Sequence, residues 1–156
     1  MGRLLPAKGR RREDYLRVIY KVKKSKGYVR IKDIAEELGV SPPSVIDFLD
    51  KLTKDGLVIY EKGGKVDLTS KGAELGKEYF ERHESIKKFL MILLNIDEEE
   101  AERETCYIEH GLSERSLERM VKFVEFISKC FKELPEFLKN LHKYYETGEL
   151  PDKCIK

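Results

Sequence analysis

The fold of this chain is decided by the stretch Ile31-Lys32-Asp33-Ile34-Ala35-Glu36-Glu37-Leu38-Gly39-Val40-Ser41-Pro42-Pro43. Apolar residues recur in its first part at the spacing of a short helix, and Gly39 is a typical helix terminator. Ser41 is suited to cap a second helix, whose first turn tolerates Pro42 and Pro43 because N–H groups there have no intrahelical partner. A helix, a tight glycine turn and a capped second helix predict a helix-turn-helix.

The second helix of this motif has a defined outer face. Its apolar stripe of Val45, Phe48, Leu49 and Leu52 is predicted to face a core, and Gly56 to end the helix. A helix presented in this way fits the DNA major groove, with its first turns against base edges. The predicted DNA-contacting residues of the cap and of the outer face are Ser41, Pro43, Ser44, Ile46, Asp47 and Lys51.

Three of these side chains suggest different contacts. Ser44 is able to donate to a base or a phosphate, Ile46 suits a thymine methyl group, and Asp47 is able to accept from a cytosine amino group. This face is only weakly basic, so affinity is expected to come from other phosphate contacts. The candidates for those contacts include the basic run Arg10, Arg11 and Arg12 near the amino terminus.

Two β-prone runs, residues 57–62 and 65–69, flank Gly63-Gly64, which is typical of a β-hairpin. A plain surface hairpin is one interpretation. After a helix-turn-helix, the wing of a winged helix is favoured, and Lys62 and Lys65 at its tip suit phosphate contacts. Upstream, residues 1–9 are expected to form a loose basic arm, and residues 11–26 a helix.

Residues 70–94 are predicted to form a long helix capped by Ser70, which leads into a second, all-helical unit. We therefore expect a mainly α chain with a winged helix-turn-helix domain at residues 1–72 and a helical domain at 73–156. The acidic run 97–100 opens one further helix and Ser113 opens another. The last helix is expected between Pro135 and Gly148.

The helix that Ser113 opens carries an apolar stripe at helical spacing. This stripe is large for a small helical unit, so we expect it to be buried against a partner chain. Its members are Leu117, Met120, Val121, Val124, Ile127 and Phe131.

A possible metal site lies in the helix that follows the acidic run. Cys106, Glu109 and His110 stand at i, i+3 and i+4 and share one face, which Glu102 extends by one turn. A thiolate, carboxylates and an imidazole together suit a divalent transition metal. A solvated helix with a buried cysteine is the alternative. His83 in the preceding helix is a weaker candidate, because a lone histidine is more often packed or exposed than a ligand.

The charge of the chain is distributed unevenly. Its 31 Lys and Arg residues nearly balance 29 Asp and Glu residues, but the amino terminus is basic and residues 97–104 are acidic. The three cysteines form no CxxC pair, which argues against a zinc knuckle or a disulfide framework. Cys130 and Cys154 fit no ligand spacing and are interpreted as structural or incidental. A signal peptide or membrane span is not expected, and a reduced, cytoplasmic setting is.

These features together resemble the iron- and manganese-dependent repressors of the diphtheria toxin repressor type, in a short form without the SH3-like domain. The resemblance covers residues 13–131. It implies a homodimer whose binding to operator DNA is promoted by Fe(II) or Mn(II). The matching segments are Glu13-Asp14-Tyr15-Leu16-Arg17-Val18-Ile19-Tyr20, Asp55-Gly56-Leu57-Val58, Leu68-Thr69-Ser70-Lys71-Gly72, Arg82-His83 and Cys106-Tyr107-Ile108-Glu109-His110.

The resemblance also implies a ligand set: Asp14, His83, Cys106, Glu109 and His110, with Glu102 beside them. Asp14 would contribute from the first helix, where a carboxylate near the helix start has a purely structural alternative. Metal would then join the two domains and fix their relative position. Three positions depart from the two-metal sites that the resemblance implies. Arg17 stands where manganese-type members of the family carry a glutamate. Lys87 and Glu102 stand where iron-type members carry a glutamate and a histidine.

Two other functional classes are alternatives to this interpretation of the sequence. An enzyme is not expected, since the sequence offers no nucleophile–base pair and no glycine-rich phosphate loop. A metal-independent winged-helix regulator is the remaining alternative. It would respond to oxidation at Cys106 or to a small molecule.

Overall fold

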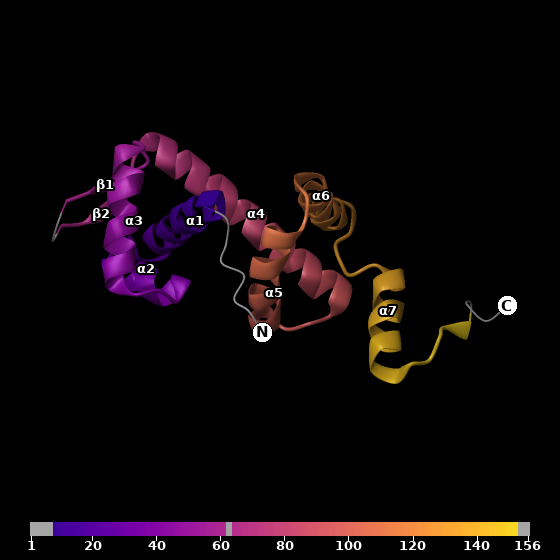
Figure 1. Ribbon diagram of the computed structural model, residues 1–156. Helices are drawn as coiled ribbons and strands as arrows, with labels where there is room; N and C mark the ends of the chain where they lie inside the picture. Colours follow the sequence, from indigo (N-terminus) through magenta and orange to yellow (C-terminus); the bar gives the residue numbers. More distant parts are fainter. Residues whose placement is uncertain (1–7, 62–63, 153–156) are drawn as a thin grey trace. The chain divides into compact units, whose positions relative to one another are not determined.

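The computed structural model describes residues 8–61 and 64–152 (Figure 1). Side chains are described from Arg12 onward. The chain is mainly helical over this part, which confirms the predicted fold class. It divides into two compact units, Met1–Glu81 and Arg82–Lys156, whereas the sequence placed the domain boundary after residue 72. The elements are α1 (Lys8–Lys26), α2 (Ile31–Leu38), α3 (Pro42–Lys54), β1 (Val58–Tyr60), β2 (Val66–Leu68), α4 (Ser70–Leu94), α5 (Glu98–Gly111), α6 (Glu114–Cys130) and α7 (Glu136–Thr147).

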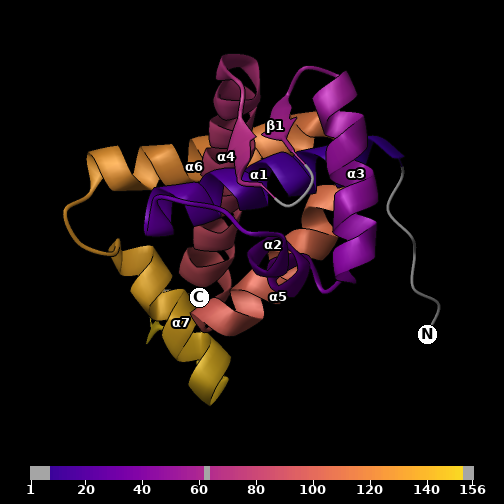
Figure 2. The ribbon, with the colours of Figure 1, turned by 90° about the vertical axis from the view of Figure 1, so that its left-hand side faces the viewer.

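The predicted helix-turn-helix is confirmed in the first unit. Gly39 ends α2 in the left-handed conformation, at φ +62°, and Ser41 caps α3 by accepting a hydrogen bond from the Ser44 amide. The two helices run in crossed directions on either side of this turn (Figure 2). At the start of α2, the Asp33 carboxylate accepts a hydrogen bond from the Arg30 amide at 3.1 Å.

The hairpin that follows α3 confirms the winged arrangement. β1 and β2 pair antiparallel, with Val58 opposite Leu68 and Tyr60 opposite Val66. Val29 adds an isolated antiparallel bridge to Val66. Lys62 and Gly63 lie outside the described residues. The buried core beneath the hairpin unites α1, α2 and α3, and its fully buried members include Leu16, Val18, Ile19, Ile34, Val45, Leu49, Leu52 and Val58.

Two helix starts differ from the sequence prediction. Ser70 is not the cap of α4, because the hydroxyl of Thr69 accepts the hydrogen bond from the Gly72 amide at 3.0 Å. The same hydroxyl donates to the Gly56 carbonyl at 2.8 Å, which favours Thr69 over its neighbour. α1 begins at Lys8 rather than at residue 11, so residues 8 and 9 are helical and not part of a loose arm. Residues 1–7 lie outside the described part.

In the second unit, Asp97 caps α5 and Ser113 caps α6, as their sequence positions predict. Leu117, Met120, Val124 and Ile127 of the α6 stripe are buried within the chain, so the prediction that these residues need a partner chain to cover them was wrong. Val121 is half-buried. Side chains of α4 and α5, among them Leu90 and Ala101, cover the Leu117 side of this stripe. Phe131 lies past the end of α6 and is exposed.

α7 starts after Pro135 and ends at Gly148, where the backbone is left-handed, which confirms the last predicted helix. In the described part of the chain, no helix has the length and apolar character needed to cross a membrane.

Candidate functional site

A buried histidine of α4 lies between two carboxylates of α5. The side chain of His83 is only 1% exposed. Its Nδ1 lies 2.8 Å from Oε2 of Glu109, and its Nε2 lies 3.0 Å from Oε1 of Glu102. Glu102 and Glu109 share one face of α5, as the sequence predicts. The structure therefore brings three of the six candidate metal ligands into one polar network.

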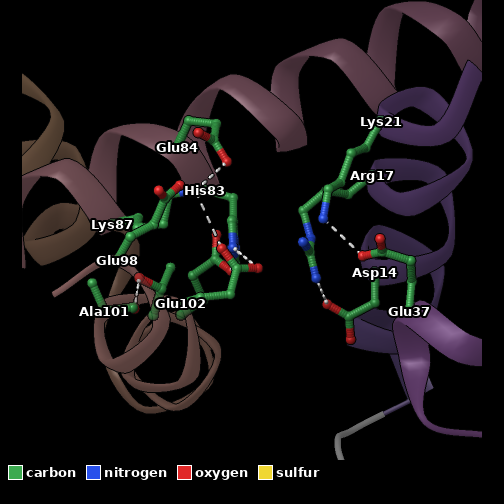
Figure 3. A network of polar contacts seen from close by, with 12 residues as sticks. Asp14, Arg17, Lys21, Glu37, His83, Glu84, Lys87, Glu98, Ala101 and Glu102 are labelled. Atoms are coloured by element: carbon green, nitrogen blue, oxygen red, sulfur yellow. Dashed lines mark hydrogen bonds and ion pairs between the residues drawn. The ribbon is translucent and has the colours of Figure 1, made fainter. Parts of the chain in front are cut away.

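Lys87 extends this network one turn further along α4 (Figure 3). Its Nζ lies 3.0 Å from Glu84, 3.2 Å from Glu98 and 3.3 Å from Glu102. Burial alone would lower the pKa of Lys87, but these carboxylates outweigh it and raise the pKa above its ordinary 10.5. The lysine is therefore a buried, permanently charged cation at neutral pH.

Glu102 joins the two halves of the network. Its Oε1 faces His83 and its Oε2 faces Lys87. The hydrogen bond with His83, followed by the charges of His83 and Lys87, lowers the pKa of Glu102 to about 2 against the opposing effect of burial. Glu102 is therefore ionised throughout the neutral range.

Glu109 is held from a second direction by the residue next to His83. Nε of Arg82 lies 3.9 Å from Oε1 of Glu109, and Nη1 of Arg82 lies 3.4 Å from Glu114. One oxygen of Glu109 thus faces the guanidinium group of Arg82, and the other faces the imidazole of His83. Because its side chain is only 9% exposed, this carboxylate has a restricted position.

Cys106 and His110 lie on α5 and are half-buried, and Cys106 is a thiol that forms no disulfide bond. Their helical spacing places them beside Glu102 and Glu109. Over residues 12–61 and 64–152, no three His, Cys, Asp or Glu side chains are arranged so that they could hold a metal ion as they stand. The donor set still fits a divalent transition metal by its chemistry, since thiolate, imidazole and carboxylate are the ligands that such ions prefer.

Asp14, the sixth candidate, belongs to the first unit. Its Oδ1 lies 3.8 Å from Nη2 of Arg17, which is buried. On the same helix, Lys21 forms an ion pair with Glu37 of α2 at 2.7 Å (Figure 3). Within its own unit, Asp14 is therefore a carboxylate already facing a cation.

The sequence did not place Arg82, Glu84 or Glu98 in this network, and it identified Lys87 only as a departure from a pattern. The spacing of Glu84 and Lys87, three residues apart on a helix, was a usable signal for their ion pair. The contacts of Lys87 with Glu98 and Glu102 cross between helices, which spacing along the chain does not reveal.

The candidate DNA-contacting side chains lie on the outer surface of the first unit. Ile46 is half-buried. The other described candidates are exposed, namely Arg12, Ser41, Pro43, Ser44, Asp47, Lys51 and Lys65. The hydroxyl of Ser44 lies 2.9 Å from that of Ser41, and the ammonium of Lys51 lies over the Phe48 ring. Side chains of Arg10, Arg11 and Lys62 lie outside the described residues.

Comparison with known proteins assigns these two units. Residues 9–66 match the family described as iron dependent repressor, N-terminal DNA binding domain. Residues 69–138 match iron dependent repressor, metal binding and dimerisation domain. The HTH-type transcriptional regulator MntR of Lysinibacillus sphaericus is 40% identical over 129 residues, which cover 83% of this chain and 89% of the relative.

The chain belongs to the iron-dependent repressor family.

Other members of the iron-dependent repressor family agree with this assignment. MntR of Bacillus subtilis is 43% identical over 117 residues, 75% of this chain and 82% of the relative. A solved manganese-dependent transcriptional repressor in complex with manganese matches 74% of this chain with a TM-score of 0.65 and 31% identity. IdeR of T. acidophilum matches 72% with a TM-score of 0.63 and 28% identity. The chain covers 53% of each of these two solved chains.

As a member of the iron-dependent repressor family, the protein is a metal-dependent transcriptional regulator with a DNA-binding region and a metal-binding, dimerising region. This confirms the resemblance noted from the sequence and does not favour the metal-independent alternative. The roles of individual residues stay predictions.

Proposed function

We propose that this protein is a homodimeric, cytoplasmic repressor that binds Fe(II) or Mn(II) in its second unit and double-stranded operator DNA with its first. The observation that supports the metal site best is the α4–α5 network. There, His83 holds Glu102 and Glu109 on the same helix face as Cys106 and His110. The network lies in the region that matches the metal-binding domain of the family.

Cys106, Glu109 and His110 are the proposed ligands on α5. A divalent ion bound there would supply positive charge and fix the three side chains relative to one another. Asp14 stays a predicted further ligand from the first unit. The thiolate of Cys106 favours the softer Fe(II), whereas the carboxylate of Asp14 favours the harder Mn(II). For His83 or Glu102 to bind the metal as well, each would have to give up a contact that it now makes. These contacts are with each other, with Glu109 and with Lys87.

The proposed DNA contacts follow from the exposure of α3 and the hairpin. Ser44, Ile46 and Asp47 lie in the first turns of α3, the part of a recognition helix that contacts base edges. Lys65, on the hairpin, and Arg12, on α1, are exposed cations suited to phosphate contacts. In a two-fold dimer, two such helices would address half-sites about one DNA turn apart.

Metal and DNA binding are proposed to be coupled. We expect metal to raise operator affinity about 100-fold, or about 2.7 kcal/mol, and operator DNA to tighten metal binding by the same factor.

The test is anaerobic fluorescence anisotropy on candidate operator DNA at fixed salt, with chelator, Mn(II), Fe(II) or Zn(II). Wild type is compared with Cys106→Ala, and Cys130→Ala, which removes an exposed thiol, serves as the matched control. Metal-dependent tightening that only Cys106→Ala abolishes supports the proposal. Equal, tight binding in chelator and in metal contradicts it.

Asp14→Ala tests the coupling itself. This variant is expected to stay folded and to lose part of the metal-dependent gain in DNA affinity. Full activation of Asp14→Ala by metal would show that Asp14 has no part in the coupling.

A further inference from the structure

Lys87 is buried although it carries a charge, which is unfavourable unless carboxylates surround the ammonium group. It meets three: Glu84 of its own helix, and Glu98 and Glu102 of α5 (Figure 3). Its side chain is 11% exposed, so solvent screens these contacts only partly. The lysine thus offsets part of the negative charge that the α4–α5 packing gathers at Glu84, Glu98 and Glu102.

Both carboxylate oxygens of Glu102 and both ring nitrogens of His83 already have partners. Glu102 gives one oxygen to His83 and the other to Lys87, and His83 gives its second nitrogen to Glu109. A metal ion bound by His83 and Glu102 would have to displace these contacts. It would also lie within a few ångströms of a fixed positive charge, where like charges repel strongly because little water separates them.

We infer that Lys87 is a fixed cation that takes the place of a second metal ion beside His83, so that each chain binds a single Fe(II) or Mn(II). The inference rests on the proposed metal site at Cys106, Glu109 and His110. His83 and Glu102 are then positioning residues. His83 holds Oε2 of Glu109, and Lys87 holds Glu102 against His83. Such outer contacts orient metal ligands and tune them.

The stoichiometry of metal binding tests this assignment without reference to DNA. Free Mn(II) is measured by electron paramagnetic resonance while Mn(II) is titrated into the reduced, full-length protein. Wild type is expected to bind one Mn(II) per chain. Lys87→Arg keeps the charge and should also bind one. Lys88→Gln removes the charge of an exposed neighbour on the same helix and should bind one as well.

Lys87→Glu replaces the cation by a carboxylate and is expected to bind two Mn(II) per chain. Lys87→Gln removes only the charge and should take up a second Mn(II) at least about 10-fold more weakly than the first. Circular dichroism establishes that each variant is folded. If Lys87→Glu does not fold, Lys87→Gln decides.

The outcomes separate the inference from the proposed function. Two Mn(II) per wild-type chain would overturn the role of Lys87 and leave the metal-dependent regulator intact. The role of Lys87 would also be overturned if Lys87→Glu and Lys87→Gln fold and still bind only one Mn(II) per chain. If wild type binds no Mn(II) and no Fe(II), the proposed metal site fails and the inference fails with it.

Discussion

Gly72 lies against the backbone of Leu57 so closely that a Cβ at position 72 would come within 1.8 Å of the Leu57 carbonyl oxygen. That oxygen accepts a hydrogen bond from the Thr69 amide at 3.1 Å, just before α4 begins. The first turn of α4 is therefore packed against the base of the hairpin at a point where a side chain has no room.

Gly72→Ala should destabilise the first unit by about 2–4 kcal/mol, because the backbone contact has to open to admit a methyl group. Thermal denaturation followed by circular dichroism measures this as a lower Tm. Gly111→Ala is the control, since a Cβ there meets no atom within 4 Å and the residue is helical. It should be neutral or slightly stabilising. Equal Tm values for wild type and Gly72→Ala would contradict the close packing.

The stability of the first unit should depend on Asp33 in acid. A hydrogen bond from Lys26, joined by one from the Arg30 amide, lowers the pKa of Asp33 below its ordinary 3.8 despite burial. A carboxylate whose pKa is lower in the folded than in the unfolded state stabilises the fold, and this contribution is fully present at pH values above the unfolded-state pKa. The contribution is lost as the pH falls through the lower, folded-state pKa. Asp33→Asn should cost about 1 kcal/mol at pH 7, mainly by weakening the start of α2.

Urea denaturation between pH 7 and pH 2 tests this expectation. The difference in unfolding free energy between wild type and Asp33→Asn should shrink as the pH falls below about 4. Asp55→Asn, at an exposed position at the end of α3, is the control and should follow wild type. A difference that stays constant down to pH 2 would show that ionisation of Asp33 is not its cause.

Glu109→Gln should weaken metal binding by at least about 10-fold and leave the fold unchanged, because the amide keeps the shape of the side chain but is a much poorer ligand. Competition with a fluorescent chelator under anaerobic conditions measures this change. Glu104→Gln, which removes an exposed carboxylate of the same helix, should leave the affinity within about twofold. If both variants bind equally, Glu109 is not a ligand.

Lys65→Ala should weaken binding to all DNA sequences alike and lower the salt dependence of binding by about one unit of slope, as expected when one phosphate contact is lost. Ile46→Ala should instead change the preference among sequences. Anisotropy titrations at several salt concentrations on specific and unrelated DNA distinguish these outcomes. Lys77→Ala, which removes an exposed cation of α4, is the control. An unchanged salt slope in Lys65→Ala would remove the hairpin from the phosphate contacts.

The motif at residues 31–43 was predictable because its signals are local. Gly39, Ser41 and the two prolines each impose a backbone conformation on their own neighbourhood. The cap of α4 was missed for the opposite reason. Two adjacent hydroxyls, Thr69 and Ser70, were both suitable, and only the position of Gly56 in three dimensions favours the first.

The candidate site was predictable only in part. Spacing along α5 groups Glu102, Cys106, Glu109 and His110, but the contact of His83 with Glu109 joins residues 26 positions apart. That contact depends on how α4 packs on α5, which periodicity does not specify. The burial of the α6 stripe was misjudged for a similar reason, since it depends on how much apolar surface α4 and α5 present to it.

The charge of Lys87 is part of the polypeptide, so neither dialysis nor a chelator can remove it. An acidic cluster balanced by an ion would repel itself whenever that ion became scarce. Here Glu84, Glu98 and Glu102 keep their counter-charge in metal-free conditions. The contacts of Lys87 between α4 and α5 therefore do not depend on the supply of metal. If Cys106 and His110 bind the metal as proposed, a change in that supply acts on the other end of α5.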